Sequence, residues 1–476
     1  MEFESVIGLE VHAELSTKTK IYCGCSTEFG GLPNSHVCPV CLGLPGSLPV
    51  LNKKVVEYAI KAGLALNCTI TKSGRMDRKN YFYPDCPKDY QITQDELPIC
   101  RDGFIEIELK DGSKKKIGIE RIHMEEDAGK LLHTGAGTLV DFNRSGVPLI
   151  EIVSRPDIRN PEEATLYLQK LKSILFSIGV SDCKMEQGSL RCDGNISVME
   201  KGSKKFGVRA EIKNVNSFKA LEKAFEYEMA RHIKAIEDGM ELTQETRRWD
   251  ENAGITVNMR SKEEANDYRY FPEGDLVTLN VSEEWIEEIR KTIPELPHEK
   301  AERFVNEYSI PKYDAGVLTL SCEMADFFDE TAKLSKDPKA ASNWLMGDIS
   351  RLMNEKAMET SDLKFNPADL AELIKLINEG TISNSIGKKV IDEMFETGKA
   401  PKLIVEEKGL IQNNDEAEIL DVVKKIIAEN PKSVEDFKNG KKRAVGFIVG
   451  LIMKETKGKA NPQIVNNLVN SELNKM

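Results

Sequence analysis

The stretch IGLEVHAEL, residues 7–15, alternates strictly between apolar and polar side chains. A period of two is typical of a β-strand with one face on a hydrophobic core. The polar face is unusual, because it carries Glu10, His12 and Glu14 where a solvated strand commonly has lysine, serine or threonine. Glu10 and His12 would lie about 7 Å apart on one side of such a strand. The pattern therefore indicates either a wet surface or one wall of a metal site.

Four further segments show the same alternation and also place an acidic residue on a sheet face. They are residues 117–130 with Glu125, 146–154 with Glu151, 186–198 with Asp193, and 208–217 with Glu211. If these strands pair in one antiparallel sheet, the carboxylates converge and repel unless cations and phosphates compensate them. Oxygen ligands with a histidine suit Mg²⁺ or Mn²⁺ better than zinc. Arg191 and Lys213, on two of the same segments, are candidates for phosphate contacts.

A single acidic residue on a strand face is usually solvated. We expect this of Glu14, Glu126 and Asp127, and we expect His123 and His133 to be surface or core histidines. Because polar, mostly acidic side chains recur on the faces of five segments, we instead expect a smaller set of them to share one site. That set is Glu10, His12, Glu125, Glu151 and Asp193.

Four cysteines follow the pattern C-x-C-x₁₂-C-x₂-C: Cys23, Cys25, Cys38 and Cys41. Two close pairs separated by a short loop predict a structural zinc site with four thiolates in a tetrahedron. The alternative is four scattered, buried thiols. The remaining cysteines lack such spacing and are expected in the core or at incidental positions: Cys68, Cys86, Cys100, Cys183, Cys192 and Cys322.

The chain of 476 residues is too long for one hydrophobic core, so two to four domains are expected. Its character changes near residue 290. Short strand-like runs separated by Gly, Pro, Asn and Asp precede that point, and almost wholly helical patterns follow it. Residues 366–380, for example, begin with Asn-Pro and end on Gly, as a capped helix does.

The acidic N-terminus lacks the basic and apolar regions of a secretory signal. The longest apolar stretch, residues 444–453, is far shorter than the roughly 20 residues needed to span a bilayer. We therefore expect a cytoplasmic protein without membrane contact, whose cysteines are thiols or metal ligands.

Charge is distributed unevenly along the chain. The net charge is −12, yet residues 431–476 carry nine lysines and arginines against four acids, a local excess of +5. A basic helical tail after an acidic body favours a nucleic-acid contact, with Lys441, Lys442 and Arg443 at its centre. The alternative is an ordinary solvated helix face.

Several nucleotide and hydrolase motifs are absent from the sequence. It has no G-x-x-x-x-G-K-[ST], no G-x-G-x-x-G and no G-x-S-x-G, so a bound nucleotide is not held by a P-loop. It also has no Gly/Ser-rich stretch of the amidase type.

Taken together, seven segments resemble the B subunit of tRNA-dependent amidotransferases, the GatB family. They are IGLEVHAEL (7–15), DRKNYFYPD (77–85), HMEEDAGK (123–130), GVPLIEIVS (146–154), GSLRCDGNIS (188–197), EIKNVNS (211–217) and DYRYFPE (267–273). The resemblance runs over essentially the whole chain. It implies an α+β protein whose glutamine-synthetase-like cradle with an antiparallel sheet spans residues 1–292. An all-α helical domain (293–405) and a small α-helical, tRNA-binding tail domain (406–476) would follow.

The resemblance also implies a reaction. ATP and Mg²⁺ would serve to phosphorylate the side-chain carboxylate of glutamate on tRNA(Gln) or aspartate on tRNA(Asn). Ammonia made in a partner amidase, the A subunit, would then displace the phosphate to give the amide. The enzyme would be an ATP-dependent, glutamine-hydrolysing ligase, a heterotrimer completed by a small C subunit.

Carried over by position, the resemblance assigns Mg²⁺ to His12, Glu125 and Glu151. Glu10 and Asp193 match further acidic positions of the same site. Two lysines match positions along the ammonia path, Lys79 and Lys88. With the phosphate-contact candidates, the catalytic set becomes Glu10, His12, Glu125, Glu151, Asp193, Arg191, Glu211 and Lys213.

Two rival functions remain from the sequence. One is a zinc-containing, tRNA-binding scaffold whose carboxylates are structural and which has no chemistry of its own. The other is a stand-alone ATP-dependent amide ligase.

Overall fold

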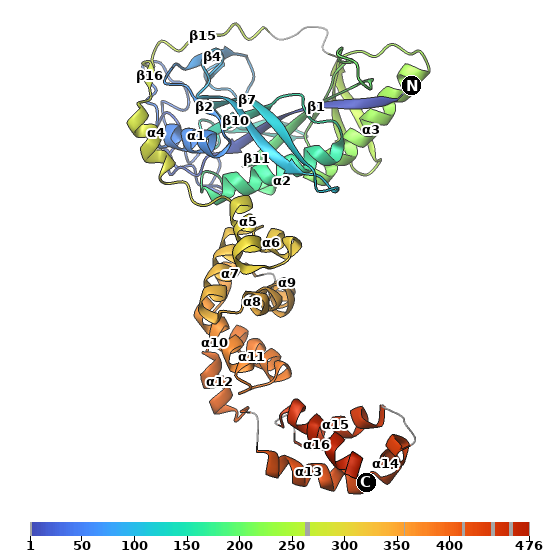
Figure 1. Cartoon of the computed structure of the whole chain (residues 1–476). Helices are drawn as coiled ribbons and strands as arrows, with labels where there is room; N and C mark the ends of the chain where they lie inside the picture. Colours follow the sequence, from blue (N-terminus) through green and yellow to red (C-terminus); the bar gives the residue numbers. More distant parts are fainter. Residues whose placement is uncertain are drawn as a thin grey trace. The chain divides into compact units, whose positions relative to one another are not determined.

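The computed structural model describes residues 2–261, 267–356, 358–411, 415–438, 443–456 and 460–475 (Figure 1). The chain forms two compact units, residues 1–296 and 297–476. The first combines a large sheet with long helices and the second is helical, which confirms the predicted α+β class. No helix among the described residues is both long and apolar enough to cross a membrane.

A nine-stranded sheet is the centre of the first unit. In spatial order its strands are β14 (Ile255–Ser261), β13 (Glu245–Asp250), β12 (Ala210–Lys213), β11 (Leu190–Glu200), β1 (Phe3–Glu14), β10 (Pro148–Ser154), β7 (Lys114–Glu126), β6 (Cys100–Glu108) and β2 (Thr69–Ile70). Neighbouring strands are antiparallel except β12 and β13, which run parallel. The strand that contains most of the opening stretch, β1, thus lies between β10 and β11, and the other two acidic segments, on β7 and β12, are one strand further away on either side.

Helices cover one face of this sheet. Ile7, Leu9 and Val11 on β1 are buried in one apolar cluster with residues of α1 (Lys53–Ala65), α2 (Pro161–Ser177) and α3 (Phe218–Glu237). Figure 1 shows α2 and α3 side by side against the sheet. Because successive strand residues point to opposite faces, the alternate, polar residues of β1 lie on the other face.

Three small sheets accompany the large one. They pair β3 (Ser73–Gly74) with β16 (Leu279–Asn280), β4 (Asp77–Asn80) with both β5 (Tyr90–Thr93) and β15 (Phe271–Pro272), and β8 (Lys130–Thr134) with β9 (Gly137–Asp141). A last helix of this unit, α4 (Glu283–Arg290), packs on α1. Lys79 lies on β4, and Lys88 comes just before β5.

The second unit contains two separate apolar clusters. The first, from Phe304 to Val405, is built by α5 (Pro297–Tyr308), α6 (Lys312–Leu318), α7 (Cys322–Ser335), α8 (Pro338–Trp344), α9 (Ser350–Lys356), α10 (Pro367–Asn378), α11 (Asn384–Thr397) and α12 (Pro401–Glu407). The second, from Ile419 to Leu473, involves α13 (Glu416–Glu429), α14 (Pro431–Lys438), α15 (Arg443–Glu455) and α16 (Pro462–Lys475). The three-domain division at residues 292 and 405 stays a prediction.

Candidate functional site

Strand register aligns a row of polar side chains across the open face of the sheet. His12 on β1 lies opposite Glu151 on β10 and opposite Arg191 on β11. Glu151 in turn lies opposite His123 on β7. Directly opposed residues of antiparallel strands point to the same face, so four strands contribute to one row.

Two residues of this row, together with Glu125 beside it, form a group of side chains spaced to hold a metal ion. Nε2 of His12 is 3.1 Å from Oε2 of Glu151 and 3.4 Å from Oε1 of Glu125. One ligand atom from each of the three residues lies within 4.8 Å of the others. Two largely buried carboxylates with one imidazole fit Mg²⁺ or Mn²⁺, the ions that the sequence predicted.

His123 is a buried histidine that the sequence did not place in this group. Its Nε2 is 3.4 Å from Oε2 of Glu151 and 3.9 Å from Oε2 of Glu125. Its alternation with Glu125 along the same strand was the available indication, because it puts both side chains on one face. His133, by contrast, is exposed, and its Nδ1 is 2.9 Å from Oγ1 of Thr138 on β9.

Charge balance in the group depends on the two histidines. Burial alone lowers the pKa of His12, but hydrogen bonding to Glu151 and the charge of Glu125 outweigh it and raise that pKa to about 9. Burial opposes ionisation of Glu151, yet the positive charges of His123 and His12 hold its pKa well below the usual range. The protonated imidazole of His12 thus offsets negative charge of the carboxylates here, a role that a bound cation would take over.

A second row runs beside the first. Glu10 on β1 lies opposite Asp193 on β11, and Nδ2 of Asn195 donates to Oε1 of Glu10 at 3.0 Å. Nζ of Lys213 is 2.9 Å from Oδ2 of Asp193 and 3.2 Å from Oε1 of Glu211. Burial, followed by the charge of Glu151, raises the pKa of Glu10. All the carboxylates that the sequence singled out therefore lie on one face of one sheet.

The end of the open face corrects two expectations. Asp127 is buried, where solvation was expected, because Nη2 of Arg191 donates to its Oδ2 at 2.7 Å and Nε of Arg144 lies 3.4 Å from the same oxygen. Glu14 is only half exposed, and burial together with the nearby Asp127 raises its pKa to about 8. Arg191 and Arg144, whose positions the local sequence does not specify, pair with the buried Asp127, whereas Glu14 keeps part of its surface in water.

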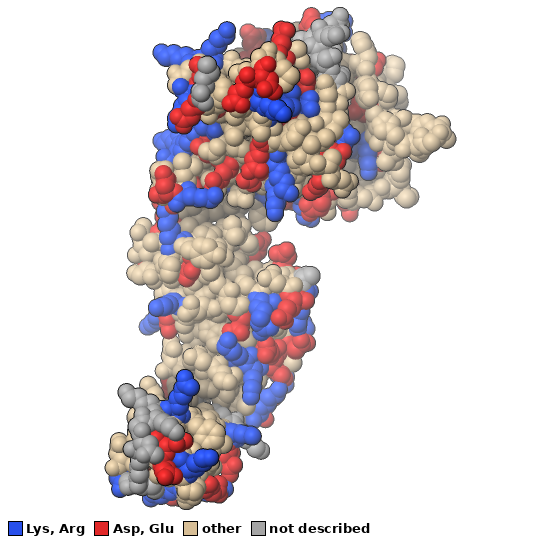
Figure 2. Space-filling view, turned by 90° about the vertical axis from the view of Figure 1, so that its right-hand side faces the viewer, with Lys and Arg blue, Asp and Glu red and all other residues tan. Residues whose placement is uncertain are grey.

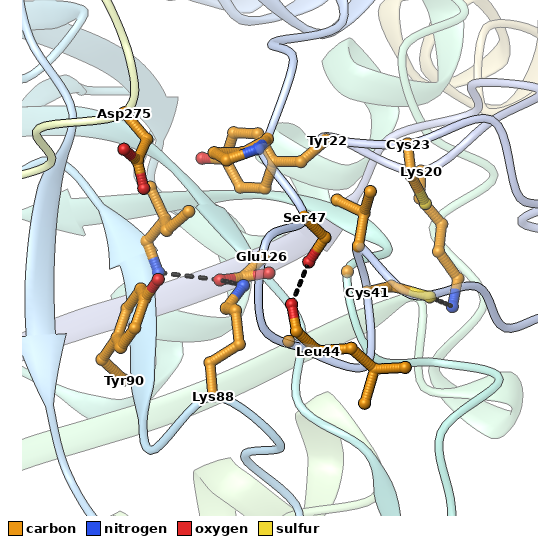
Figure 3. Close-up of a pocket in the computed structure, with 15 residues that line it drawn as sticks. Lys20, Tyr22, Cys23, Cys41, Leu44, Ser47, Lys88, Tyr90, Glu126 and Asp275 are labelled. Atoms are coloured by element: carbon orange, nitrogen blue, oxygen red, sulfur yellow. Dashed lines mark hydrogen bonds and ion pairs between the residues drawn. The ribbon is translucent and has the colours of Figure 1, made fainter.

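Glu126 is also buried, against expectation, and it forms an ion pair with Lys88. Its Oε1 accepts the backbone N–H of Ile92 at 2.8 Å as well. A cavity of about 100 Å³ surrounds the pair, with Tyr22 and Tyr90 among its lining residues. Figure 3 shows the amine of Lys88 directed at the Glu126 carboxylate inside this pocket.

Lys79 lies on β4, near enough to the possible metal ligands Glu125 and Glu151 for their charges to affect it. Its Nζ is 5.0 Å from the ring centroid of Tyr268. Burial lowers the pKa of this amine, but the charges of Glu125 and Glu151 together with the nearby Tyr268 and Tyr270 outweigh it and raise the pKa. The two lysines assigned to an ammonia path are therefore associated with adjacent carboxylates, Glu125 and Glu126.

The four spaced cysteines come together, and the alternative of scattered thiols is wrong. One sulfur from each of Cys23, Cys25, Cys38 and Cys41 lies within 4.8 Å of the others, so the cluster can hold a metal such as zinc. Nζ of the fully buried Lys20 is 3.6 Å from Sγ of Cys41. Hydrogen bonding from Cys23 and the charge of Lys20 lower the pKa of Cys41 to about 4, which favours the thiolate that a metal requires.

The other cysteines follow their expectation. Cys68, Cys86, Cys100, Cys183 and Cys192 are buried. Cys322 is half-buried at the start of α7.

Only part of the predicted basic tail surface can be located. Arg443 is exposed at the start of α15, whereas Lys441 and Lys442 lie outside the described residues. On the face drawn in Figure 2, basic and acidic residues are interspersed over the second unit. The nucleic-acid contact of this tail stays a prediction.

Comparison with known proteins gives matches along most of the chain. Residues 5–287 match the family model described as "GatB/GatE catalytic domain", and residues 326–473 match the one described as "GatB domain". The B subunit of the aspartyl/glutamyl-tRNA(Asn/Gln) amidotransferase of Clostridium botulinum (strain Langeland) is 80% identical over 476 residues, the whole of both chains. The protein of the same name from Clostridium tetani (strain Massachusetts) is 75% identical over the same length.

Proposed function

The chain belongs to the GatB family, and on that basis we propose that it is the B subunit of a tRNA-dependent amidotransferase. It phosphorylates the side-chain carboxylate of glutamate on tRNA(Gln), aspartate on tRNA(Asn), or both, and then transfers ammonia to the activated carbonyl. The observation that supports this most strongly is the row of His123, Glu151, His12 and Arg191 on four strands, with Glu125 beside it. This row therefore combines a site for a metal ion with a positively charged side chain, Arg191, that can bind phosphate.

The chemistry divides into two displacements. In the first, a carboxylate oxygen of the aminoacyl group attacks the γ-phosphorus of ATP, the bond to the β-phosphate oxygen breaks, and ADP leaves. In the second, the nitrogen of ammonia attacks the acyl carbon, and phosphate leaves. Both transition states carry spread negative charge, so fixed positive groups supply most of the catalysis.

Each candidate residue has a place in this scheme. His12, Glu125 and Glu151 would hold Mg²⁺, which shields the phosphate charges when it is bound. Arg191 and Lys213 contact phosphate oxygens, and Asp193 and Glu211 orient the Lys213 amine through the contacts described above. Glu10, whose pKa is raised, accepts the proton that the attacking ammonia must lose.

Ammonia reaches the site from a partner amidase, the A subunit, and a small C subunit completes a heterotrimer. We place the path past Lys88 and Glu126, which line a small cavity, and then past Lys79, whose amine is influenced by the charge of Glu125. The protein acts in the cytoplasm, where aminoacyl-tRNA is made.

Two further features complete the proposal. The four cysteines bind a structural zinc ion, and the buried ammonium of Lys20 offsets part of the negative charge of the thiolates. The cradle covers residues 1–292, the helical domain 293–405, and the tail domain 406–476. Residues 441–443 in the tail contact tRNA phosphates.

The test is ATP hydrolysis by the purified complex, with and without misacylated tRNA. We expect tRNA-dependent ATP cleavage, and Glu125→Gln should reduce it by a thousand-fold or more, since metal coordination contributes several kcal/mol at about 1.4 kcal/mol per ten-fold. Glu120→Gln, elsewhere on β7, is the matched control. A complex that binds tRNA but cleaves ATP equally well with Glu125→Gln would support the scaffold alternative instead.

A further inference from the structure

The small cavity around Lys88 and Glu126 has a second wall, made by part of the cysteine cluster (Cys23, Cys25, Cys38 and Cys41). Cys23 and Cys41 both line it, together with residues next to each of them in sequence. Figure 3 shows these two cysteines to one side of the pocket and the Lys88–Glu126 pair near its centre. The possible metal centre and the ion pair therefore share one cavity.

The segment before the first cysteine pair contacts the charged end of Lys88. Tyr22, directly before Cys23, is only 4% exposed, and the centroid of its ring is 5.8 Å from Nζ of Lys88. The ring of Tyr90 lies at a similar distance from this amine, 5.6 Å. Aromatic faces attract an ammonium group at such distances, so the two rings help to keep the amine beside Glu126.

The segment after the second cysteine pair contacts the aliphatic part of Lys88. Gly43 follows Cys41 by two residues and has φ +67°. A Cβ at this position would lie 2.5 Å from Cγ of Lys88 and 3.3 Å from its Cα. Because Cγ is close to the backbone, it cannot yield without moving the whole lysine side chain. Glycine is therefore what lets the two segments come this close.

Hydrogen bonds make the turn that contains Gly43 a unit with the second cysteine pair. N of Leu42 donates to O of Cys38 at 3.0 Å. N of Gly43 donates to O of Val40 at 3.0 Å. A displacement of Cys38 or Cys41 is therefore passed on to Gly43, and from Gly43 to Lys88.

A metal ion would tie these two contacts together. Twelve residues separate Cys25 from Cys38, so chain connectivity alone does not hold one cysteine pair against the other. An ion bound by all four sulfurs would do so. Lys88 would then be held between Tyr22 beside the first pair and Gly43 beside the second.

We propose that the cysteine cluster positions Lys88 through Tyr22 and Gly43, so that its metal ion serves ammonia transfer as well as folding. The inference rests on the proposed function, which assigns zinc to the four cysteines and the ammonia path to Lys88. Gly43 is a positioning residue, because it acts only by setting where the Lys88 amine lies. Loss of this contact loosens the Lys88–Glu126 pair and slows ammonia transfer, whereas ATP cleavage at the carboxylate row continues.

Asparagine at position 43 tests the contact, because asparagine adopts a positive φ more readily than most side chains but still carries a Cβ. Gly46→Asn is the matched control. Gly46 lies in the same loop with φ +84°, and nothing lies within 4 Å of where its Cβ would stand. Both variants keep all four cysteines, so their zinc content should match that of the wild type.

The first measurement is glutamine-dependent amidation by the whole complex. Gly43→Asn should reduce it about as much as Lys88→Met does, up to about ten-fold, while tRNA-dependent ATP cleavage persists. Gly46→Asn should behave as the wild type. The double variant of Gly43→Asn and Lys88→Met should be no slower than Lys88→Met alone, because both changes remove the same contact.

Hydrogen exchange provides a readout that does not depend on activity. The N–H of Ile92 donates to Oε1 of Glu126 at 2.8 Å, and the same oxygen pairs with Lys88. This amide should exchange at least several-fold faster, relative to the amides of β11, in Gly43→Asn and in wild type stripped of metal by a chelator. Its exchange in Gly46→Asn should not change.

The outcomes separate this inference from the proposed function. If Gly43→Asn amidates like the wild type while Lys88→Met is impaired, the positioning role is wrong and the proposed function stands. Unchanged exchange of Ile92 in both Gly43→Asn and the metal-free protein would also overturn the positioning role. If Lys88→Met amidates like the wild type, the path assignment in the proposed function fails first, and the exchange of Ile92 then decides whether the cysteine cluster positions Lys88.

Discussion

Glu228 on α3 provides the sharpest test of what holds the sheet edge beside the candidate site. Its fully buried carboxylate is 2.7 Å from Nη2 of Arg231, 3.1 Å from Nε of Arg247 on β13, and 3.3 Å from Nε2 of His232. It also accepts a hydrogen bond from Thr256 on β14. The perturbation we consider is Glu228→Gln, which keeps the shape but removes the charge and leaves Arg231 and Arg247 to share Glu245 as their remaining anion.

The magnitude follows from the pKa of Glu228. Burial opposes its ionisation, but hydrogen bonds from His232, Arg231 and Thr256 lower the pKa from an ordinary 4.5 to about 2. A shift of that size corresponds to about 3 kcal/mol of folding free energy at neutral pH. Arg231 is partly exposed, so solvent screens its share, and we expect Glu228→Gln to cost about 2 kcal/mol.

Urea unfolding at several pH values measures this cost. Because the folded-state pKa is depressed, the stabilisation is complete above pH 4.5 and is lost as the pH falls from 4.5 toward 2. Wild type and Glu228→Gln should therefore differ at pH 7 and converge near pH 2 to 3. Glu226→Gln, an exposed position on the same helix, is the matched control. An equal difference at pH 7 and pH 3 would refute the electrostatic origin of the effect.

Three further predictions concern metal, ammonia and tRNA. Elemental analysis should find about one zinc per chain. Cys38→Ser should lower zinc content and stability together, whereas the control Cys322→Ser should change neither. Full stability of the metal-free protein would argue against a structural zinc. Lys88→Met should reduce glutamine-dependent amidation about ten-fold, because it leaves the buried carboxylate of Glu126 without its ion-pair partner. ATP cleavage that depends on tRNA should persist in this variant. An equal loss of both activities would argue against a role of Lys88 in the ammonia path. Neutralising residues 441–443 should reduce the salt slope of tRNA affinity by roughly two to three units in filter binding, and an unchanged slope would place recognition elsewhere.

Local sequence patterns determined a large part of this protein. The period of two in residues 7–15 predicted a strand and assigned Glu10 and His12 to one face, because side-chain alternation is a property of the strand itself. The cysteine spacing predicted the thiol cluster from local geometry too. Only one residue separates Cys23 from Cys25 and only two separate Cys38 from Cys41, so each pair is close by chain connectivity alone. Capping patterns such as Asn366-Pro367 likewise marked a helix start, where the Asn366 side chain accepts from backbone amides.

Only the tertiary structure decided which of these faces meet. The register that sets His12 opposite Glu151, and Glu151 opposite His123, joins strands that are distant in sequence. The same holds for the burial of Asp127 and Glu126, which depends on Arg191 and Lys88 from other segments. Strand periodicity says on which side a residue points but not which strand comes to lie beside it. The packing of apolar strand faces against helices across the whole unit makes that choice. Local sequence patterns are therefore not sufficient to predict which distant strands pair.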